Sequence, residues 1–358
     1  MRLFSGLSPQ KKEAFGLDIG SSAIKLVQLG NRPGGYQLQA HAVVPLPPEV
    51  ISEGLIRDRA TAVQAVRQAV SKAGITGNNA VIAVSGRELI VKRLQLPKVP
   101  AKELDGAIRL EAEHHIPFAI DDVYLDYQIL RKAPGSNGTM DVVLVAVKKT
   151  KVDDYVALAG AAGLNPVVVD VDSFALENQF ELNYPELAGE TVALIDIGAS
   201  VMKINVVRGG ASIFVRDIAF GGNNFTQAIA KRLKVPFEQA EAVKRGEGGN
   251  VQWDDVVPAL EAVSRELALE IQRTLDYFAS TTEPERIHQI LLSGGCARLA
   301  GLDEYLSSSW GIPLEIANPL KGIELDPERF RHEDHLETGP MLAVAVGLAI
   351  RHPGDGPK

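Results

Sequence analysis

The chain has 358 residues, and its hydrophobic content of 46% is enough for one large core or two moderate ones. Lysine and arginine total 37 against 45 aspartates and glutamates, without a long block of one sign, which argues against a general nucleic-acid-binding protein. The single cysteine, Cys296, excludes a fold held by internal disulfides and favours a reducing compartment. We therefore expect a mildly acidic protein of two lobes.

Neither end of the chain predicts a membrane segment. Residues 1–13 include Lys11 and Lys12 but no apolar core of a signal peptide. The longest apolar stretch, Met341 to Ile350, is about half as long as a helix that spans a bilayer. We predict a cytoplasmic protein that does not insert into the membrane directly, so that any membrane contact comes through a partner.

Two matching segments determine the predicted architecture. They are Asp18 to Lys25 (DIGSSAIK) and Asp196 to Lys203 (DIGASVMK). Each follows an apolar strand, turns at its glycine and enters a second strand, and a third strand follows at residues 36–44 and 211–218. This repeated three-strand meander predicts an internal duplication, with a first domain at 13–190, a second at 191–350, and a flexible tail at 351–358.

The periodicity between these meanders predicts α/β structure in both halves. The first half has a helix around Val63 to Val70 and a short strand at 80–84. It also carries an α+β insert at about 91–165. The predicted order there is strand, helix (101–115), strand (123–131), Gly-rich turn (134–138), strand (142–148) and helix (150–163). The second half has a helical insertion at about 223–283, with helices at 223–233 and 263–278, and then a strand at 287–292.

The repeated Asp-x-Gly turns predict a phosphate-binding site. Such a turn exposes backbone N–H groups to an anion, and its aspartate can hold Mg²⁺ directly or through water. A single copy would be interpreted as a hairpin turn, but two facing copies would clamp a triphosphate. We predict Asp18 and Asp196 as metal ligands and the following residues as ATP contacts: Asp18, Gly20, Ser21, Ser22, Lys25, Asp196, Gly198, Ala199, Ser200 and Lys203.

A glycine-containing loop after the last predicted strand, LLSGGCARLAG at Leu291 to Gly301, is a candidate for the adenosine end of the site. Gly294 and Gly295 would let the backbone approach a flat base or a phosphate, and Arg298 lies in the same loop. Cys296 is predicted to be a packed residue rather than a nucleophile, because no activating histidine lies nearby in the sequence.

The order of these loops resembles the superfamily of actin, sugar kinases and chaperone ATPases. By this resemblance Asp172, near the start of the connecting helix, orients the attacking water; the alternative is an ordinary acidic first turn. Glu241 and Lys244 would hold the ribose, although their i,i+3 spacing also suits a surface ion pair. The backbone at Gly221, Gly222 and Asn223 would add N–H donors near the phosphates.

The insert narrows the resemblance to the FtsA family of division proteins and the PilM family of type IV pilus assembly proteins. It contains LQLP at 94–97, EAEHHIPF at 111–118 and VYLDY at 123–127, which look closely like the PilM family. Adjacent His114 and His115 point about 100° apart on a helix, so they do not predict a metal site. The last residues, 351–358, lack the amphipathic anchor typical of FtsA-like proteins.

The PilM resemblance implies a scaffold of the pilus machinery, associated with twitching motility, that binds ATP and Mg²⁺ in a structural or regulatory role, with at most weak ATPase activity. Its expected partners are the N-terminal cytoplasmic tail of PilN, held in a groove between the first domain and the insert, and other inner-membrane pilus assembly proteins. These partners would recruit it to the inner face of the inner membrane, and homo-oligomers are compatible with this role. The alternatives are a phosphotransferase for a small metabolite, with Asp172 as general base, and an FtsA-like division scaffold.

Overall fold

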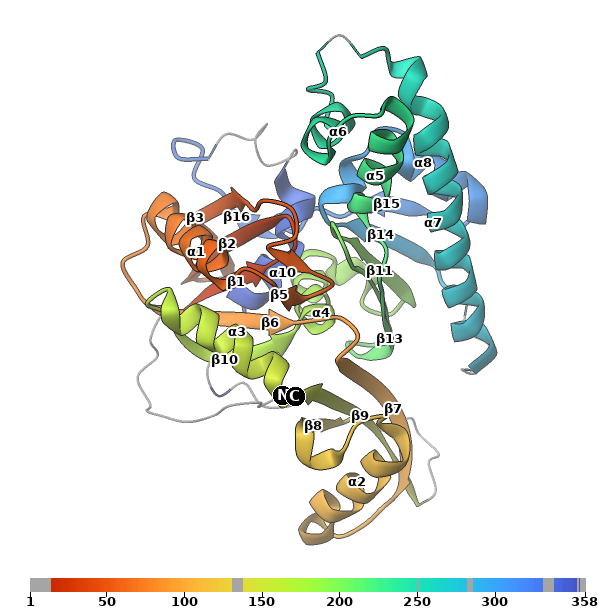
Figure 1. Ribbon diagram of the computed structural model, residues 1–358. Coiled ribbons are helices and arrows are strands. Elements are labelled where there is room, and N and C mark those ends of the chain that lie inside the picture. Colours follow the sequence, from red (N-terminus) through yellow and green to blue (C-terminus); the bar gives the residue numbers. More distant parts are fainter. Residues whose placement is uncertain are drawn as a thin grey trace.

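The computed structural model describes residues 14–130, 138–249, 251–281, 286–330, 338–352 and 354. Residues 1–13, all of the predicted turn 134–138 except Gly138, and most of the predicted tail lie outside the described residues. Figure 1 shows two sheet-containing lobes side by side and a smaller unit attached below them. In the part of the chain that the structure describes, no helix combines the length and apolar character needed to cross a membrane.

The central strands of the two lobes have the same order and direction. The first sheet is β10-β6-β1-β2-β3-β16 and the second is β13-β12-β11-β14-β15. In each, the meander pairs antiparallel and its first strand pairs parallel with a later one, β6 or β14. The internal duplication and the α/β class predicted from the repeat are therefore confirmed. The bounds of these strands are β1 (Phe15–Ile19), β2 (Ala23–Arg32), β3 (Gly35–Pro45), β6 (Asn79–Val84), β10 (Asn165–Val171), β16 (Ile323–Glu324), β11 (Val192–Ile197), β12 (Met202–Val207), β13 (Ser212–Ile218), β14 (Gln289–Ser293) and β15 (Leu314–Ile316).

Two helices, α1 (Arg59–Ala73) and α3 (Lys149–Ala161), pack against each other beside the first sheet. The α1 helix begins at an Asp58 cap and buries a stripe of small side chains that includes Ala62, Val66 and Ala69. A short hairpin of β4 (Ile51–Ser52) and β5 (Leu55–Ile56) lies between β3 and α1 in the chain. Glu53, in the turn of this hairpin, contacts Ser200 of the second lobe.

The two lobes are joined by helices that pack across them. Helix α4 (Asp172–Asn183) follows the first sheet and packs against β6 and β10 of that sheet as well as β12 and β13 of the second, whereas α10 (Ala343–Ala349) ends the second half and packs against β1 and β2 of the first. The two helices also contact each other closely, because a Cβ atom on Gly347 would overlap the carbonyl oxygen of Ala175. Short 3₁₀ turns, η2 (Pro185–Leu187) and η4 (Gly339–Leu342), lie after α4 and before α10.

The smaller unit is the insert. Its sheet has the order β7-β9-β8, built from β7 (Leu89–Pro97), β8 (Val123–Ile129) and β9 (Thr139–Lys148), with the turn η1 (Ile120–Asp122) before β8. Helix α2 (Ala101–His115) has the predicted bounds. Alternate residues of β9 face in opposite directions, as expected for a strand. Val142, Leu144 and Ala146 join the core beneath α2, whereas Val143, Val145 and Val147 belong to the core of the first lobe.

The predicted end of the insert differs from the structure. The sequence predicts that the helix after β9 belongs to the insert and that the insert ends at about residue 165. In the structure this helix, α3, contributes Val152, Tyr155 and Leu158 to the core of the first lobe. Its apolar stripe is compatible with either location, and only the tertiary packing decides between them.

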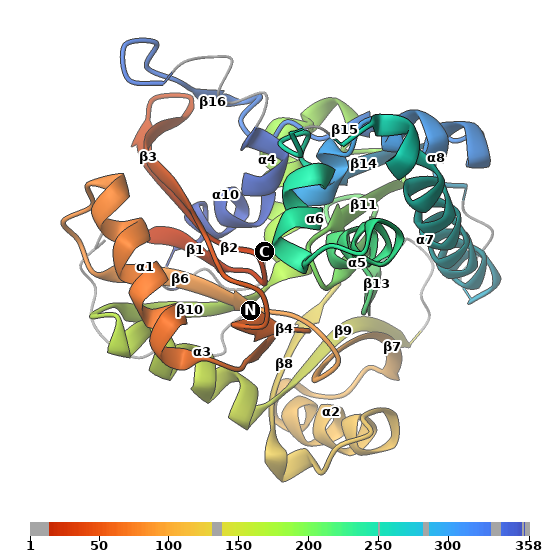
Figure 2. The ribbon, with the colours of Figure 1, turned by 45° about the horizontal axis from the view of Figure 1, so that its top comes forward.

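The second lobe carries the predicted helical insertion. It consists of α5 (Gly222–Leu233), α6 (Phe237–Lys244) and the long α7 (Trp253–Thr281), and the lobe ends with η3 (Gly295–Arg298) and α8 (Leu302–Trp310). The α7 helix begins earlier than the predicted position 263. Asp254 and Asp255 occupy its first turn, where acidic side chains are favourable, and Pro258 is accommodated just beyond it. Figure 2 shows α5, α6 and α7 grouped on the side of the second lobe.

Gly347→Ala is expected to lower the free energy of unfolding by about 1–3 kcal/mol, because the added methyl group overlaps the backbone of α4. Gly160→Ala is the matched control. Gly160 is also helical, but a Cβ atom there meets no atom within 4 Å, so alanine should be neutral or stabilising. Urea unfolding of both variants measures the difference, and equal stabilities would contradict the close packing of α10 on α4.

Candidate functional site

The two Asp-x-Gly loops have nearly the same local structure. Asp18 lies opposite Lys25 on the neighbouring strand, with 2.8 Å between its Oδ2 and the lysine Nζ. Asp196 lies opposite Lys203, with 2.9 Å between its Oδ1 and the Nζ. The lysine seven positions after each aspartate is thus its cross-strand partner, because the tight turn at Gly20 or Gly198 brings the two strands together.

The two loops meet at the interface between the lobes. The hydroxyl oxygens of Ser21 and Ser200 lie 2.5 Å apart, and the backbone N–H of Glu53 donates to the Ser200 Oγ over 3.3 Å. The structure therefore brings the two candidate phosphate loops face to face. Because the serine side chains touch, a triphosphate between the loops requires them to separate.

Asp172 joins the same cluster. It occupies the first turn of α4, and its Oδ2 lies 3.2 Å from the Lys203 Nζ, so this ammonium sits between the carboxylates of Asp172 and Asp196. The Ser293 hydroxyl donates to the second oxygen of Asp196 over 3.1 Å. All four side chains are buried. Asp172 is thus an ion-pair partner, and it lies where the connecting helix begins.

Burial and charge act against each other in this cluster. Burial opposes the charge on Lys203, but the carboxylates of Asp196, Asp172 and Asp18 outweigh it and raise the lysine pKa well above its usual value. Burial raises the pKa of Asp18, although Lys25 partly compensates by favouring the charged form. Lys203 therefore remains cationic, and it supplies positive charge that a polyphosphate requires.

The predicted backbone donors at Gly221, Gly222 and Asn223 have another function in this structure. The N–H of Gly222 donates to the Gly198 carbonyl over 2.9 Å, and that of Asn223 donates to the Ala199 carbonyl over 2.8 Å. The N–H of Gly221 donates to the Asn224 side chain. These groups fix the second Asp-x-Gly loop on the start of α5, so the expectation that they point toward phosphates does not describe this state of the molecule.

Glu241 and Lys244 form an ion pair of 2.7 Å that also contacts α5. The lysine donates to the Thr226 hydroxyl and to the Gly222 carbonyl, and Thr226 donates to Glu241. The pair is therefore part of a network between α5 and α6 and not an isolated surface pair. It holds α6 close to the backbone that supports Ala199 and Ser200.

The two glycines of the predicted adenosine loop differ. Gly294 has a φ of 89°, and a Cβ atom on it would overlap the backbone of Ile197, so it is needed for the packing of the loop itself. A Cβ atom on Gly295 would meet only the Met341 side chain, at 3.9 Å. The Arg298 guanidinium lies 3.5 Å from the Met341 sulfur. Burial raises the pKa of the Cys296 thiol to about 12, which agrees with a packed cysteine.

The metal prediction rests on Asp18 and Asp196 alone. Among the described residues, no group of three or more His, Cys, Asp or Glu side chains is arranged to hold a metal ion. Magnesium at nucleotide sites takes one or two carboxylates, with phosphate oxygens and water as its other ligands. Each of these two aspartates is engaged by its own lysine, and a metal would have to compete with that ion pair.

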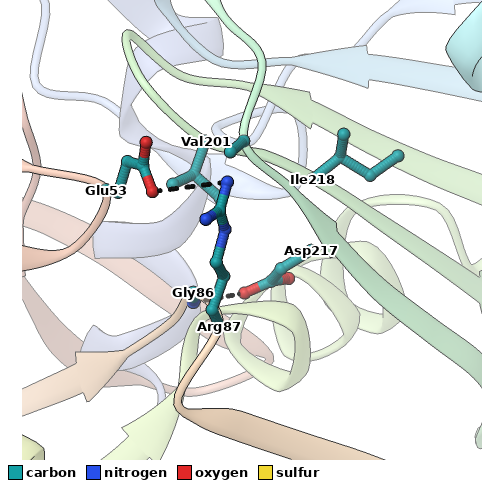
Figure 3. Close-up of a pocket in the computed structure, with 7 residues that line it drawn as sticks. Glu53, Gly86, Arg87, Val201, Asp217 and Ile218 are labelled. Atoms are coloured by element: carbon teal, nitrogen blue, oxygen red, sulfur yellow. Dashed lines mark hydrogen bonds and ion pairs between the residues drawn. The ribbon is translucent and has the colours of Figure 1, made fainter.

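A second interlobe contact was not predicted from the sequence. The backbone N–H of Gly86 donates to Asp217 Oδ2 over 2.6 Å, joining the segment before β7 to the end of β13. A cavity of about 10 Å³, enough for one water molecule, lies at this contact (Figure 3). Its walls include Glu53, Gly86 and Arg87 on one side and Val201, Asp217 and Ile218 on the other.

The contacts of Lys151 and Tyr155 with the β4-β5 hairpin were also not predicted from the sequence. The Lys151 ammonium donates to the Gly54 carbonyl over 2.5 Å, and the Tyr155 hydroxyl donates to the same oxygen over 3.1 Å. Burial lowers the pKa of Lys151, although Glu88, Asp172 and Asp217 favour its charged form. The sequence gives no signal for these contacts, since each residue lies in an ordinary helix, strand or hairpin pattern.

Comparisons with known proteins agree on the fold and indicate a family. A family model described as type IV pilus assembly protein PilM matches residues 16–353. The solved structure of a PilM–PilN type IV pilus biogenesis complex has 34% sequence identity and a TM-score of 0.86, covering 96% of this chain and 99% of that one. Cell division protein FtsA of Escherichia coli K12 is 24% identical over 94% of this chain and 90% of its own length.

The actin-like fold is also found in a more distant structure. MreB5 of Spiroplasma citri, solved bound to ADP, has a TM-score of 0.54 with 13% identity, covering 94% of each chain. At this identity the likeness concerns the fold alone.

Asp217→Asn is expected to change the pH dependence of stability. Burial raises the pKa of this carboxyl from 3.8 to about 6, against the favourable Gly86 hydrogen bond, and Lys203, Asp172 and Lys151 are the charges that act on it. Between these two values the folded protein binds a proton that the unfolded chain lacks. Stability therefore falls as pH rises from 4 to 6, by about 3 kcal/mol at most.

Asparagine cannot ionise, so this decrease should be absent in the variant and its advantage over the wild type should grow up to pH 6. Urea unfolding at several pH values measures it. Asp58→Asn is a control of opposite sign, because hydrogen bonds from Thr61 lower the pKa of Asp58 and stabilise the protein above pH 4. A parallel pH profile of the wild type and Asp217→Asn would contradict the burial of this carboxyl.

Proposed function

The chain belongs to the family of type IV pilus assembly protein PilM, and we propose that it binds ATP between its lobes and the N-terminal cytoplasmic tail of PilN at its insert. The observation that carries this proposal is the likeness to the PilM–PilN complex, which extends over 96% of the chain and therefore includes the insert. Bound to PilN, the protein would lie at the inner face of the inner membrane, in contact with other pilus assembly proteins.

The charges at the lobe interface support nucleotide binding. Two serine hydroxyls, two lysines and two aspartates from the matching loops lie together there, and this donor set suits a triphosphate with Mg²⁺. Lys25 and Lys203 would exchange an aspartate for phosphate oxygens, which would free Asp18 and Asp196 to bind the metal or its water ligands. The metal would neutralise phosphate charge, and Asp172 would be placed to orient water.

The packing of the insert sheet, whose two faces are both covered, indicates where a partner would bind. One face of β9 is covered by α2 and the other by the first lobe, so a peptide would bind where these units meet rather than on an open sheet face. The Tyr124 hydroxyl of β8 donates to Asp153 of α3 over 3.1 Å across this boundary. Tyr124 is therefore our candidate for an aromatic contact with the tail.

The two alternative functions, an FtsA-like division scaffold and a phosphotransferase for a small metabolite, have less support. The identity to the PilM–PilN complex, 34%, exceeds the 24% identity to the E. coli FtsA protein. The match to the pilus assembly family over residues 16–353 favours that role over the phosphotransferase hypothesis. We therefore propose that the nucleotide is a structural or regulatory ligand.

Gly295→Val is expected to abolish ATP binding while the protein remains folded, because the new side chain would extend into the space proposed for the adenosine and meets only the flexible Met341 side chain. Gly189→Val is the control, since Gly189 is exposed and a Cβ atom there meets nothing within 4 Å. Calorimetric titration with ATP and Mg²⁺ measures binding. Unchanged affinity in a folded Gly295→Val protein would place the base elsewhere.

Tyr124→Ala is expected to weaken binding of a labelled PilN N-terminal peptide at least tenfold, which corresponds to about 1.4 kcal/mol, a common loss for an interface aromatic residue. Tyr277→Ala is the matched control, because Tyr277 is an exposed aromatic side chain of α7 in the second lobe. Fluorescence anisotropy titrations give both affinities. If the wild type fails to bind the peptide at all, the proposed partner is wrong; if only the variant is unaffected, the contact lies elsewhere.

A further inference from the structure

The attachment of the insert to the first lobe lies directly beside the lobe interface. The insert leaves the first lobe through Ser85 to Glu88, between β6 and β7, and returns where β9 runs into α3. Gly86 in the outgoing segment donates its N–H to Asp217 of the second lobe. Strand β7 also packs against β13, the strand that carries Asp217. The insert is therefore in contact with both lobes at its root.

The hairpin of β4 and β5 forms a second connection at the same place. The Glu53 N–H donates to Ser200 of the second lobe, and the Glu53 carboxylate lies 3.6 Å from the guanidinium of Arg87 at the insert root. One residue further, the Gly54 carbonyl accepts from Lys151 and Tyr155 of α3, near the point where the insert returns. The hairpin thus links Ser200 to both ends of the insert.

The same serine connects this arrangement to the candidate phosphate loops. Ser200 Oγ contacts Ser21 Oγ of the first loop as well as the Glu53 N–H. A ligand that separates the loops must move Ser200 away from Ser21. This displacement also acts on the Glu53 contact and on Asp217, which lies on the same lobe.

The closed arrangement buries the Asp217 carboxylate. Its Oδ2 accepts the Gly86 N–H, and its Oδ1 is buried without a hydrogen-bond partner among the described residues. Burial of a carboxylate disfavours its charged form. Separation of the lobes would expose the group to water, so the contact is suited to break and re-form.

We propose that Asp217 is a positioning residue for the insert: its hydrogen bond with Gly86 holds the insert root against the second lobe when the loops touch, and releases the insert when a ligand parts them. This deepens the proposed function, on which it rests for the identity of the ligands, by connecting the nucleotide site to the tail-binding site. Loop separation would change the position of the insert relative to the first lobe, and hence the affinity for the PilN tail.

The first test measures the insert position directly and needs no partner. Spin labels are attached through Lys102→Cys on α2 and Glu266→Cys on α7, both exposed, while the native Cys296 is buried and should remain unlabelled. Pulsed electron resonance then gives the distance between insert and second lobe. Removal of the carboxylate by Asp217→Ala should broaden this distribution in nucleotide-free protein, whereas Asp217→Asn, which keeps a side-chain oxygen to accept from Gly86, should retain the wild-type distribution.

An unchanged distribution in Asp217→Ala would overturn the proposal whether or not nucleotide binds. A purely structural role is distinguished by urea unfolding. If Asp217→Ala and Asp217→Asn are equally stable but differ in the distance distribution, the hydrogen bond and not global stability positions the insert. If both variants broaden alike, the Gly86 hydrogen bond is not the positioning contact, and the proposal fails.

The second test measures coupling on the full chain. The affinity for the PilN peptide is titrated without nucleotide and with saturating ATP and Mg²⁺, and the ratio should lie between about 5 and 150 in the wild type if the coupling is of ordinary size. In Asp217→Ala this ratio should approach 1, with ATP affinity within a few fold of the wild type, and Asp217→Asn should restore it. A wild-type protein that binds both ligands with a ratio near 1, or an undiminished ratio in Asp217→Ala, would overturn the coupling, whereas loss of peptide binding altogether in the wild type would refute the proposed function.

Discussion

The Lys203 ammonium group is the interaction on which the arrangement of the lobes depends. It lies buried between the carboxylates of Asp196, in the second sheet, and Asp172, in the first turn of the helix that leaves the first sheet. Removal of the Lys203 ammonium would leave two buried carboxylates without compensation, and an uncompensated buried charge generally costs about 3–5 kcal/mol. The chain therefore has a strong electrostatic reason to keep the connecting helix against the second lobe at this point.

The two Asp-x-Gly loops differ in the number of acidic partners that their lysine has. In the first copy one aspartate pairs with one lysine, Asp18 with Lys25, and burial raises the pKa of the carboxyl. In the second copy the lysine has two acidic partners, since the helix after the first sheet contributes Asp172. The position of α4 explains this difference, because this helix packs on both sheets and its first turn places Asp172 beside the second loop. Duplication thus gives two similar loops, and the connection between the halves makes one of them more tightly held.

Local patterns in the sequence were sufficient for the fold class, the duplicated meander and the bounds of α2, since each depends on periodicity or on a tight turn within a short segment. The sequence also predicted that the loops around Ser21 and Ser200 face each other, and the structure places them in contact. It could not predict the contact of Asp217 between the lobes or the contact of Lys151 with the β4-β5 hairpin. Their partners are backbone groups of Gly86 and Gly54. Every residue type has a backbone carbonyl, and every type except proline has a backbone N–H, so the sequence carries no sign of the pairing. The assignment of α3 failed for a related reason, because its apolar stripe does not specify which neighbouring core it enters.

The two connections of the insert to the first lobe are held by different contacts. On the return side, β9 passes directly into α3 at Lys148 and Lys149, and the first turn of α3 is anchored by buried Lys151. On the outgoing side, Gly86 adopts a φ of 98°, a conformation in which glycine is favoured, and a Cβ atom there would come within 3.0 Å of the Glu53 carbonyl oxygen. Rotation of the insert should therefore occur about the return side, with the outgoing segment changing its contacts. The Gly86 N–H donates to Asp217, so the contact that depends on lobe closure acts on the outgoing connection of the insert.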